Sequence, residues 1–120
     1  MQNSRKEYNM AKDDYFVIAC RILSYLYDCL KKGNDVDIEQ ISFETLNIKQ
    51  SYYEYIIKHM VQDGYLEGVK FISTIGRKTP ACDIDDIMIT PKGIEFLEDN
   101  SKMKKAVEFL KTLKETVPGI

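Results

Sequence analysis

Apolar residues recur at helical spacing over residues 13–32, the most strongly patterned stretch of the chain. They form two neighbouring stripes, with Phe16, Ala19, Leu23, Leu26 and Leu30 in the first and Tyr15, Ile18, Ile22, Tyr25 and Cys29 in the second. Together the stripes are wider than the apolar face of a surface helix, so we expect this helix to pack on more than one side. Lys31, Lys32 and Gly33 are typical of its C-terminal end.

A shorter helix is predicted over residues 37–46, with Ile38, Ile41 and Leu46 inward. Residues 47–50 then turn the chain toward a third helix. This segment therefore has the order helix, turn, helix.

The third helix carries a capping pattern at each end. Ser51 and Glu54 match the S-x-x-E capping box, in which two side chains bond to backbone N–H groups of the first turn, so we expect the helix to start at Ser51. It runs to about Asp63, and Gly64 is the residue expected just beyond its end. Its inward stripe consists of Tyr53, Ile56, Ile57 and Met60.

After Leu66 the apolar pattern changes to a period of two, which is typical of strands. The alternating positions are Val69, Phe71 and Ile75 in a first strand, and Ile87 and Ile89 in a second. Residues 76–83, which include glycine, proline and charged residues, are expected to form the loop between these strands. The pattern predicts a β-hairpin.

Thr90 as N-cap and Pro91 at the first helical position predict a further helix. Asn100 and Ser101 interrupt it, and a last helix reaches Val117.

The predicted fold is α+β and mostly helical: a winged helix-turn-helix of three helices and a β-hairpin wing, with additional C-terminal helices. We expect residues 1–12 to be a flexible N-terminus and residues 13–98 to be the winged-helix domain. Residues 99–120 are expected to form a C-terminal amphipathic helix, packed on the domain or used for dimerisation. Each local signal agrees with its neighbours, which supports the assignment.

The composition is that of one soluble globular domain: 120 residues, 44% hydrophobic and 30% charged. No apolar run approaches the ~20 residues that cross a bilayer, and the N-terminal 14 residues lack the apolar stretch of a signal peptide. We therefore expect a cytoplasmic protein with no membrane partner. Cys20, Cys29 and Cys82 have no paired spacing and the chain has one histidine, so we expect no zinc site and small, partly buried thiols.

Two stretches of the sequence resemble a known family: LNIKQSYYEYIIKHMVQDGYLEGV and IMITPKGIEFLEDNSKMKKA are similar to the YjcQ family. The resemblance covers most of residues 15–117, and its sharpest parts are DGYLEGV and ITPKGIEFLEDNS. It implies a small winged-helix protein of bacteria and their prophages. It brings no established catalytic or binding residues.

The third helix is the candidate DNA-recognition helix, because this element of a helix-turn-helix faces base edges in the major groove. Its outward candidates are Lys49, Gln50, Ser51, Tyr52, Tyr55, Lys58 and Gln62. Glutamine can bind adenine, and serine and tyrosine can bind phosphate. In the wing, Arg77 and Lys78 are candidates for phosphate contact. We therefore predict a DNA-binding protein with double-stranded DNA as partner, in the role of a small transcriptional regulator of prophage origin.

The alternative is a protein-interaction module that does not bind DNA. The net charge of −2 counts against a nucleic-acid partner, and Asp83, Asp85 and Asp86 follow the basic wing tip closely. Tyr52 and Tyr55, predicted to share an outer face, suit a protein partner equally well. The four cations named above are also fewer than the ~6–10 phosphate contacts of strongly charged binders, so specific DNA binding would need a dimer.

A seam on the last helix offers a route to a homodimer. Its members, at 3-4-3-4 spacing, are Met103, Ala106, Leu110, Leu113 and Val117. The same stripe can instead pack onto the first helix of its own chain, because two heptads are short for an isolated coiled coil.

No catalytic residue, metal ligand or cofactor is predicted. His59 is the one histidine, and the three wing aspartates lack the glycine and distal glutamate of a calcium loop. The sequence contains no nucleophile elbow, H-E-x-x-H, P-loop or dinucleotide fingerprint. We expect a protein that is not an enzyme.

Overall fold

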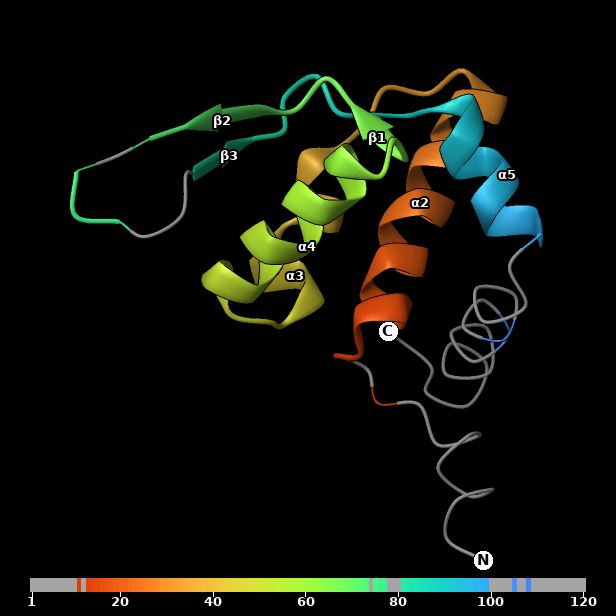
Figure 1. Ribbon diagram of the computed structural model, residues 1–120. Coiled ribbons are helices and arrows are strands. Elements are labelled where there is room, and N and C mark those ends of the chain that lie inside the picture. Colours follow the sequence, from red (N-terminus) through yellow and green to blue (C-terminus); the bar gives the residue numbers. More distant parts are fainter. Residues whose placement is uncertain are drawn as a thin grey trace, which may run out of the picture.

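Helix α2 (Tyr15–Lys32) lies between α4 and α5 in the computed structural model, which describes residues 11, 13–73, 75–77, 81–99, 105 and 108 (Figure 1). Members of both apolar stripes are fully buried, which confirms that the helix packs on more than one side. Leu30 was expected inward but is 50% exposed, although Cys29 in the same last turn is buried. Gly33 ends the helix in the left-handed conformation, with φ of 69°.

The predicted helix over residues 37–46 is wrong as one continuous element. It is divided into a 3₁₀ turn, η1 (Ile38–Ile41), and a short helix, α3 (Phe43–Leu46). Ser42 separates them because its backbone is extended and its hydroxyl accepts a hydrogen bond from the Thr45 N–H (3.2 Å), which starts a new helix.

Helix α4 (Gln50–Gln62) buries the predicted stripe against α2 and α3. The Tyr53 hydroxyl donates a hydrogen bond to the Ile41 carbonyl (2.7 Å), so the polar group of this buried side chain has a hydrogen-bond partner. Gly64 has φ of 85°, and the Tyr65 N–H bonds back to the Met60 carbonyl (2.9 Å). The predicted glycine stop is confirmed as a Schellman motif.

Two short antiparallel ladders follow α4. In the first, β1 (Leu66–Glu67) pairs with β4 (Met88–Ile89), and in the second, β2 (Lys70–Ile72) pairs with β3 (Ala81–Asp83). The second ladder projects from the helical body as a hairpin (Figure 1). The prediction that residues 76–83 form only a loop is wrong, because Ala81–Asp83 pairs with β2 although its own sequence has little strand character.

The chain bends between the two ladders at Gly68, which has φ of 77°. A Cβ at this position would overlap the backbone carbonyl of Asp86, so the close approach requires glycine. In the segment between β3 and β4, the Asp83 carboxylate accepts a hydrogen bond from the Asp85 N–H (3.0 Å), and the Ile87 N–H donates to the Ile84 carbonyl (3.1 Å). The Asp83 side chain therefore helps to form the turn that brings the chain back to β4.

Helix α5 (Pro91–Asp99) starts as predicted. The Thr90 hydroxyl accepts a hydrogen bond from the Gly93 N–H (2.9 Å) and donates one to the Gly64 carbonyl (2.6 Å). This threonine both caps α5 and ties it to the end of α4.

The described residues thus form an α+β, mostly helical fold, as predicted at that level. All three cysteines are free thiols, with Cys20 and Cys29 buried and Cys82 half-buried. Within the described part of the chain, no helix combines the length and apolar character needed to cross a membrane. The predicted N-terminal segment 1–12 and the C-terminal segment 99–120 fall almost entirely outside the described residues.

Candidate nucleic-acid interface

The outward face of α4 is a stripe of hydrogen-bonding side chains. Ser51, Tyr55, Lys58 and Gln62 are all exposed and follow one another at 4-3-4 spacing, which places them on one face of the helix. Lys49 and Gln50, also exposed, lie at its N-terminal end. Six of the seven residues predicted on this helix are therefore accessible to a partner.

The predicted capping box at Ser51 and Glu54 is wrong. Asn47 adopts the left-handed conformation (φ of 59°) and ends α3, and the extended Lys49 then serves as the N-cap of α4 without a side-chain cap bond. The helix therefore starts two residues earlier than the box requires, with Lys49 in place of Ser51 as the N-cap. Ser51 is left in the first turn, and Glu54 is too far along the helix to reach back to the cap.

Glu54 instead forms a buried ion pair with Arg77 of the hairpin loop. Its side chain is 4% exposed and is the one carboxylate in the sequence of α4. Its second oxygen accepts a hydrogen bond from the Gln50 amide (3.2 Å), and the Arg77 side chain is 32% exposed. The pair removes negative charge from the α4 surface and links the hairpin to the first turns of this helix.

Arg77 was predicted as a phosphate contact, and the pairing with Glu54 was missed. The one clue in the sequence was the position of Glu54, three residues before Ile57 and so beside the inward stripe of α4. Lys78, the other predicted wing contact, lies outside the described residues.

Tyr52 and Tyr55 do not share an outer face, contrary to the prediction. Tyr52 is half-buried, and its hydroxyl donates to the Asp13 carbonyl (2.7 Å), while burial, followed by the Asp13 charge, raises the pKa of the phenol. Tyr55 is 53% exposed, and its ring packs in a tilted arrangement against His59, with centroids 4.3 Å apart. Only the second tyrosine is well placed to contact a partner.

The hairpin exposes several apolar side chains. Phe71 is 37%, Ile72 54% and Ile75 102% exposed. Ile75 was predicted as an alternating strand residue, but it lies in the loop after β2, where no described side chain covers it. Cys82, across the ladder from Phe71, is more sheltered, and burial raises the pKa of its thiol to about 11.

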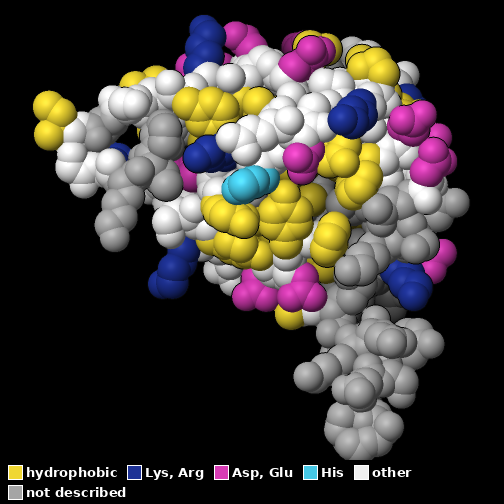
Figure 2. Space-filling model, viewed as in Figure 1, with side chains coloured by type: hydrophobic (Ala, Val, Ile, Leu, Met, Phe, Trp, Pro, Cys, Tyr) yellow, Lys and Arg dark blue, Asp and Glu magenta, His cyan; other side chains and the backbone are white. Residues whose placement is uncertain are grey.

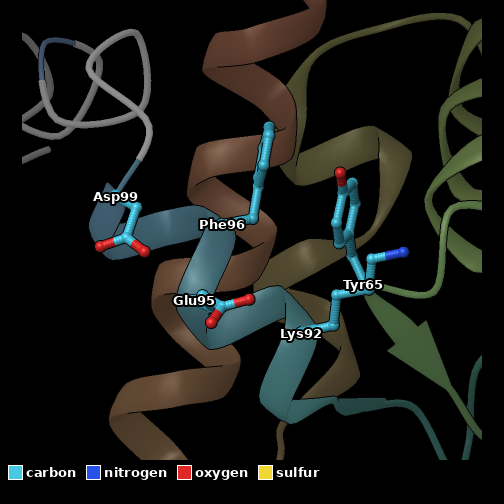
Figure 3. Close-up of a pocket in the computed structure, with 5 residues that line it drawn as sticks. All are labelled: Tyr65, Lys92, Glu95, Phe96 and Asp99. Atoms are coloured by element: carbon cyan, nitrogen blue, oxygen red, sulfur yellow. The ribbon is translucent and has the colours of Figure 1, made fainter.

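An aromatic groove lies on the side of the molecule where α5 meets the first turn of α2 and the end of α4. Its walls are Tyr15, Phe16, Tyr65 and Phe96, around a hollow of about 250 Å³. The Tyr65 ring, from the turn between α4 and β1, stacks on the Phe96 ring of α5, with centroids 4.4 Å apart (Figure 3). Figure 2 shows the apolar side chains gathered on this face beside the histidine. The sequence analysis did not predict this groove.

The remaining points are metal binding, for which no residue was predicted, and the predicted dimer seam. Across the described ranges, no group of three histidine, cysteine or carboxylate side chains is placed to hold a metal ion. The five seam residues of the predicted dimer, Met103, Ala106, Leu110, Leu113 and Val117, lie outside these ranges.

The YjcQ family, described as YjcQ protein, matches residues 20–116 of the chain. No curated protein and no solved structure gave a match. The matched stretch includes α4, both ladders and α5, and it covers most of the sequence. The chain therefore belongs to the YjcQ family.

Proposed function

We propose that this protein binds double-stranded DNA as a winged helix-turn-helix, with α4 in the major groove and the β2–β3 hairpin as the wing. The order of helices followed by an antiparallel hairpin supports this assignment. The element that precedes α4 is short, and Asn47, in the left-handed conformation, ends it before the turn into α4.

The surface of α4 is the observation that carries the proposal. Its exposed stripe offers a hydroxyl, a phenol, an ammonium and an amide, and its one carboxylate is buried under Arg77. A helix that lies against a polyanion must keep carboxylates off its outer face, since a like charge there costs affinity. Glutamine and serine can contact base edges, and lysine can contact phosphate.

The number of exposed cations sets the expected strength. Lys49 and Lys58 are exposed, whereas Arg77 is engaged with Glu54. With two phosphate contacts per chain, two copies on neighbouring half-sites would give a logarithmic salt slope of about −3.6. We propose specific binding by two copies, in the role of a small regulator of transcription.

A salt titration on random duplex DNA tests the proposal. Anisotropy of a labelled duplex should show binding that weakens between about 50 and 200 mM salt. Lys58→Glu should weaken it at least about tenfold, because the substitution places a like charge against phosphate. Lys31→Glu, an equal change of net charge on the exposed end of α2, should leave it nearly unchanged. Equal losses in both variants, or no binding at low salt, would overturn the proposal.

The exposed apolar hairpin favours a second candidate function, which is binding to a protein. Phe71, Ile72 and Ile75 gain nothing from contact with phosphate, but burial at an interface would be favourable for them. Failure of DNA binding at low salt, together with an intact fold, would favour this candidate. The proposal gives no residue a catalytic role.

A further inference from the structure

The aromatic groove is an apolar surface that is only partly covered by the described residues. Tyr15, Phe16, Tyr65 and Phe96 are each half-buried, so each leaves apolar area that a further segment can remove from water. A second hollow, of about 290 Å³, continues from the shared rings of Tyr65 and Phe96 along α5 to Asp99.

The chain itself continues from the end of this groove. Asp99 is both the last residue of α5 and part of the lining of the second hollow, and residues 100–120 follow it directly. The seam lies within this stretch. Lys105 and Glu108, which the structure describes, are helical and exposed. Both are roughly opposite Leu110 on a helix of 3.6 residues per turn, so the seam and the exposed residues occupy different faces.

The charges of the groove and the C-terminal stretch are complementary. The groove and the second hollow are bordered by exposed carboxylates of Asp63, Glu95 and Asp99. Lys92 is a cation on the same helix as Glu95 and Asp99 (Figure 3). The Asp63 charge contributes, after burial, to raising the pKa of Tyr15. Residues 101–120 contain five lysines and two glutamates: Lys102, Lys104, Lys105, Lys111 and Lys114 against Glu108 and Glu115. Individual surface ion pairs are weak. However, the excess of carboxylates beside the groove and the excess of lysines in residues 101–120 together favour packing of that segment on this face.

We propose that residues 101–117 pack as a helix in the aromatic groove of their own chain, with the seam turned toward Tyr65 and Phe96. The tether at Asp99 gives the segment an effective concentration in the millimolar range, so weak contacts suffice within one chain. The same two heptads would be marginal as a free coiled coil between copies. A seam that is buried in its own chain is not available to a second copy. The protein would therefore be a monomer in solution, and two copies would come together only when they bind neighbouring DNA half-sites.

A single tryptophan in the full chain tests the packing, because the natural sequence contains none. Leu113→Trp places the reporter on the seam, and Thr112→Trp places it on the opposite side of the predicted helix. We expect the seam reporter to emit at shorter wavelength and to be quenched several-fold less by acrylamide. Leu110→Trp, a second seam position, repeats the measurement if the Leu113 variant fails to fold. Equal quenching of the seam reporter and the Thr112 reporter would overturn the proposal.

Two further measurements locate the contact. Reversing the charge of the three carboxylates that border the groove (Asp63→Lys, Glu95→Lys, Asp99→Lys) gives the rim variant. In this variant, acrylamide should quench the seam reporter more, toward the level of the Thr112→Trp reporter. A matched reversal away from the groove (Asp35→Lys, Glu44→Lys, Glu67→Lys) should not, and circular dichroism should show both sets folded. Sedimentation should show a monomer. The fluorescence emission of the seam reporter should not depend on protein concentration. A concentration-dependent dimer would assign the seam to a second copy, and unchanged quenching in the rim variant would place the helix elsewhere; either result overturns the proposal.

Discussion

Helix α2 and the β2–β3 hairpin are held in place by different physical forces. Eight residues of α2 are buried, whereas all three residues of β2 are exposed. Among the residues that the structure describes, the hairpin contacts the body through the Arg77–Glu54 ion pair and through Cys82, which packs against the core. Gly68 lies against the Asp86 backbone where the hairpin leaves the body. Apolar burial is distributed over many contacts, but the hairpin depends on a few specific residues. Its position relative to α4 should therefore be easier to change than the helical body.

The largest effect should come from the body. Ile57→Ala removes a side chain that is fully buried between α4 and its neighbours. Loss of its burial and the cavity left behind should lower the free energy of unfolding by about 4 kcal/mol. Urea denaturation followed by circular dichroism measures this loss. Lys58→Ala, the adjacent exposed position, should change stability by less than about 0.5 kcal/mol. A comparable loss in both variants would show that α4 is not anchored by its inward stripe.

A smaller effect is expected where the hairpin leaves the body. Gly68→Ala adds a Cβ that overlaps the Asp86 carbonyl and forces alanine to a φ of 77°, so we expect a loss of about 3 kcal/mol. Gly76→Ala is the matched control, since Gly76 has a similar φ of 87° but nothing within 4 Å of the added Cβ. It should cost about 1 kcal/mol, the conformational part alone. Equal losses would mean that the close approach at Gly68 contributes nothing.

The sequence predicted the body better than the hairpin for the same reason. The helices were predicted from periodic burial, and their ends were marked by local features at Gly33, Gly64 and Thr90. These signals depend only on neighbouring residues. Strand β3 had no comparable signal, because Ala81–Asp83 becomes a strand by pairing with β2. Its existence is a tertiary effect.

The candidate site shows the same limit. The exposed stripe on α4 follows from helical spacing. Every residue predicted for this surface is exposed except Tyr52, which is half-buried. Tyr52 was misplaced because its hydroxyl bonds to Asp13, 39 positions earlier in the chain. Glu54 was assigned to a local cap, whereas its actual partner is Arg77, 23 positions away. Local patterns favour local partners, and both errors are of this kind.

Removing the ion pair should have an intermediate effect. Arg77→Met leaves the buried Glu54 carboxylate without its cation, which we expect to lower stability by about 2 kcal/mol, less than a fully buried pair because Arg77 is 32% exposed. Adding Glu54→Met should restore most of the loss, since two apolar side chains can replace a buried pair. Lys70→Met, an exposed cation on β2, is the control and should be nearly neutral. An additive double variant would show that the two residues do not act as a pair.

The smallest effect at neutral pH should come from Cys82, and it should grow as the pH rises. Burial in the hairpin, then the Glu54 charge, raises the pKa of this thiol to about 11, against roughly 8.5 in an unfolded chain. Between these values the unfolded chain releases a proton that the folded chain keeps, so the thiol favours unfolding increasingly with pH. Cys82→Ala should therefore match the natural protein's pH dependence below about pH 8 and lose stability less steeply from about pH 8.5 to 11. Urea midpoints of the two proteins, compared across this range, isolate the thiol because the tyrosines that also titrate there are common to both. Parallel curves would mean that the β3 side of the hairpin is open to water, which would make the hairpin still less dependent on burial.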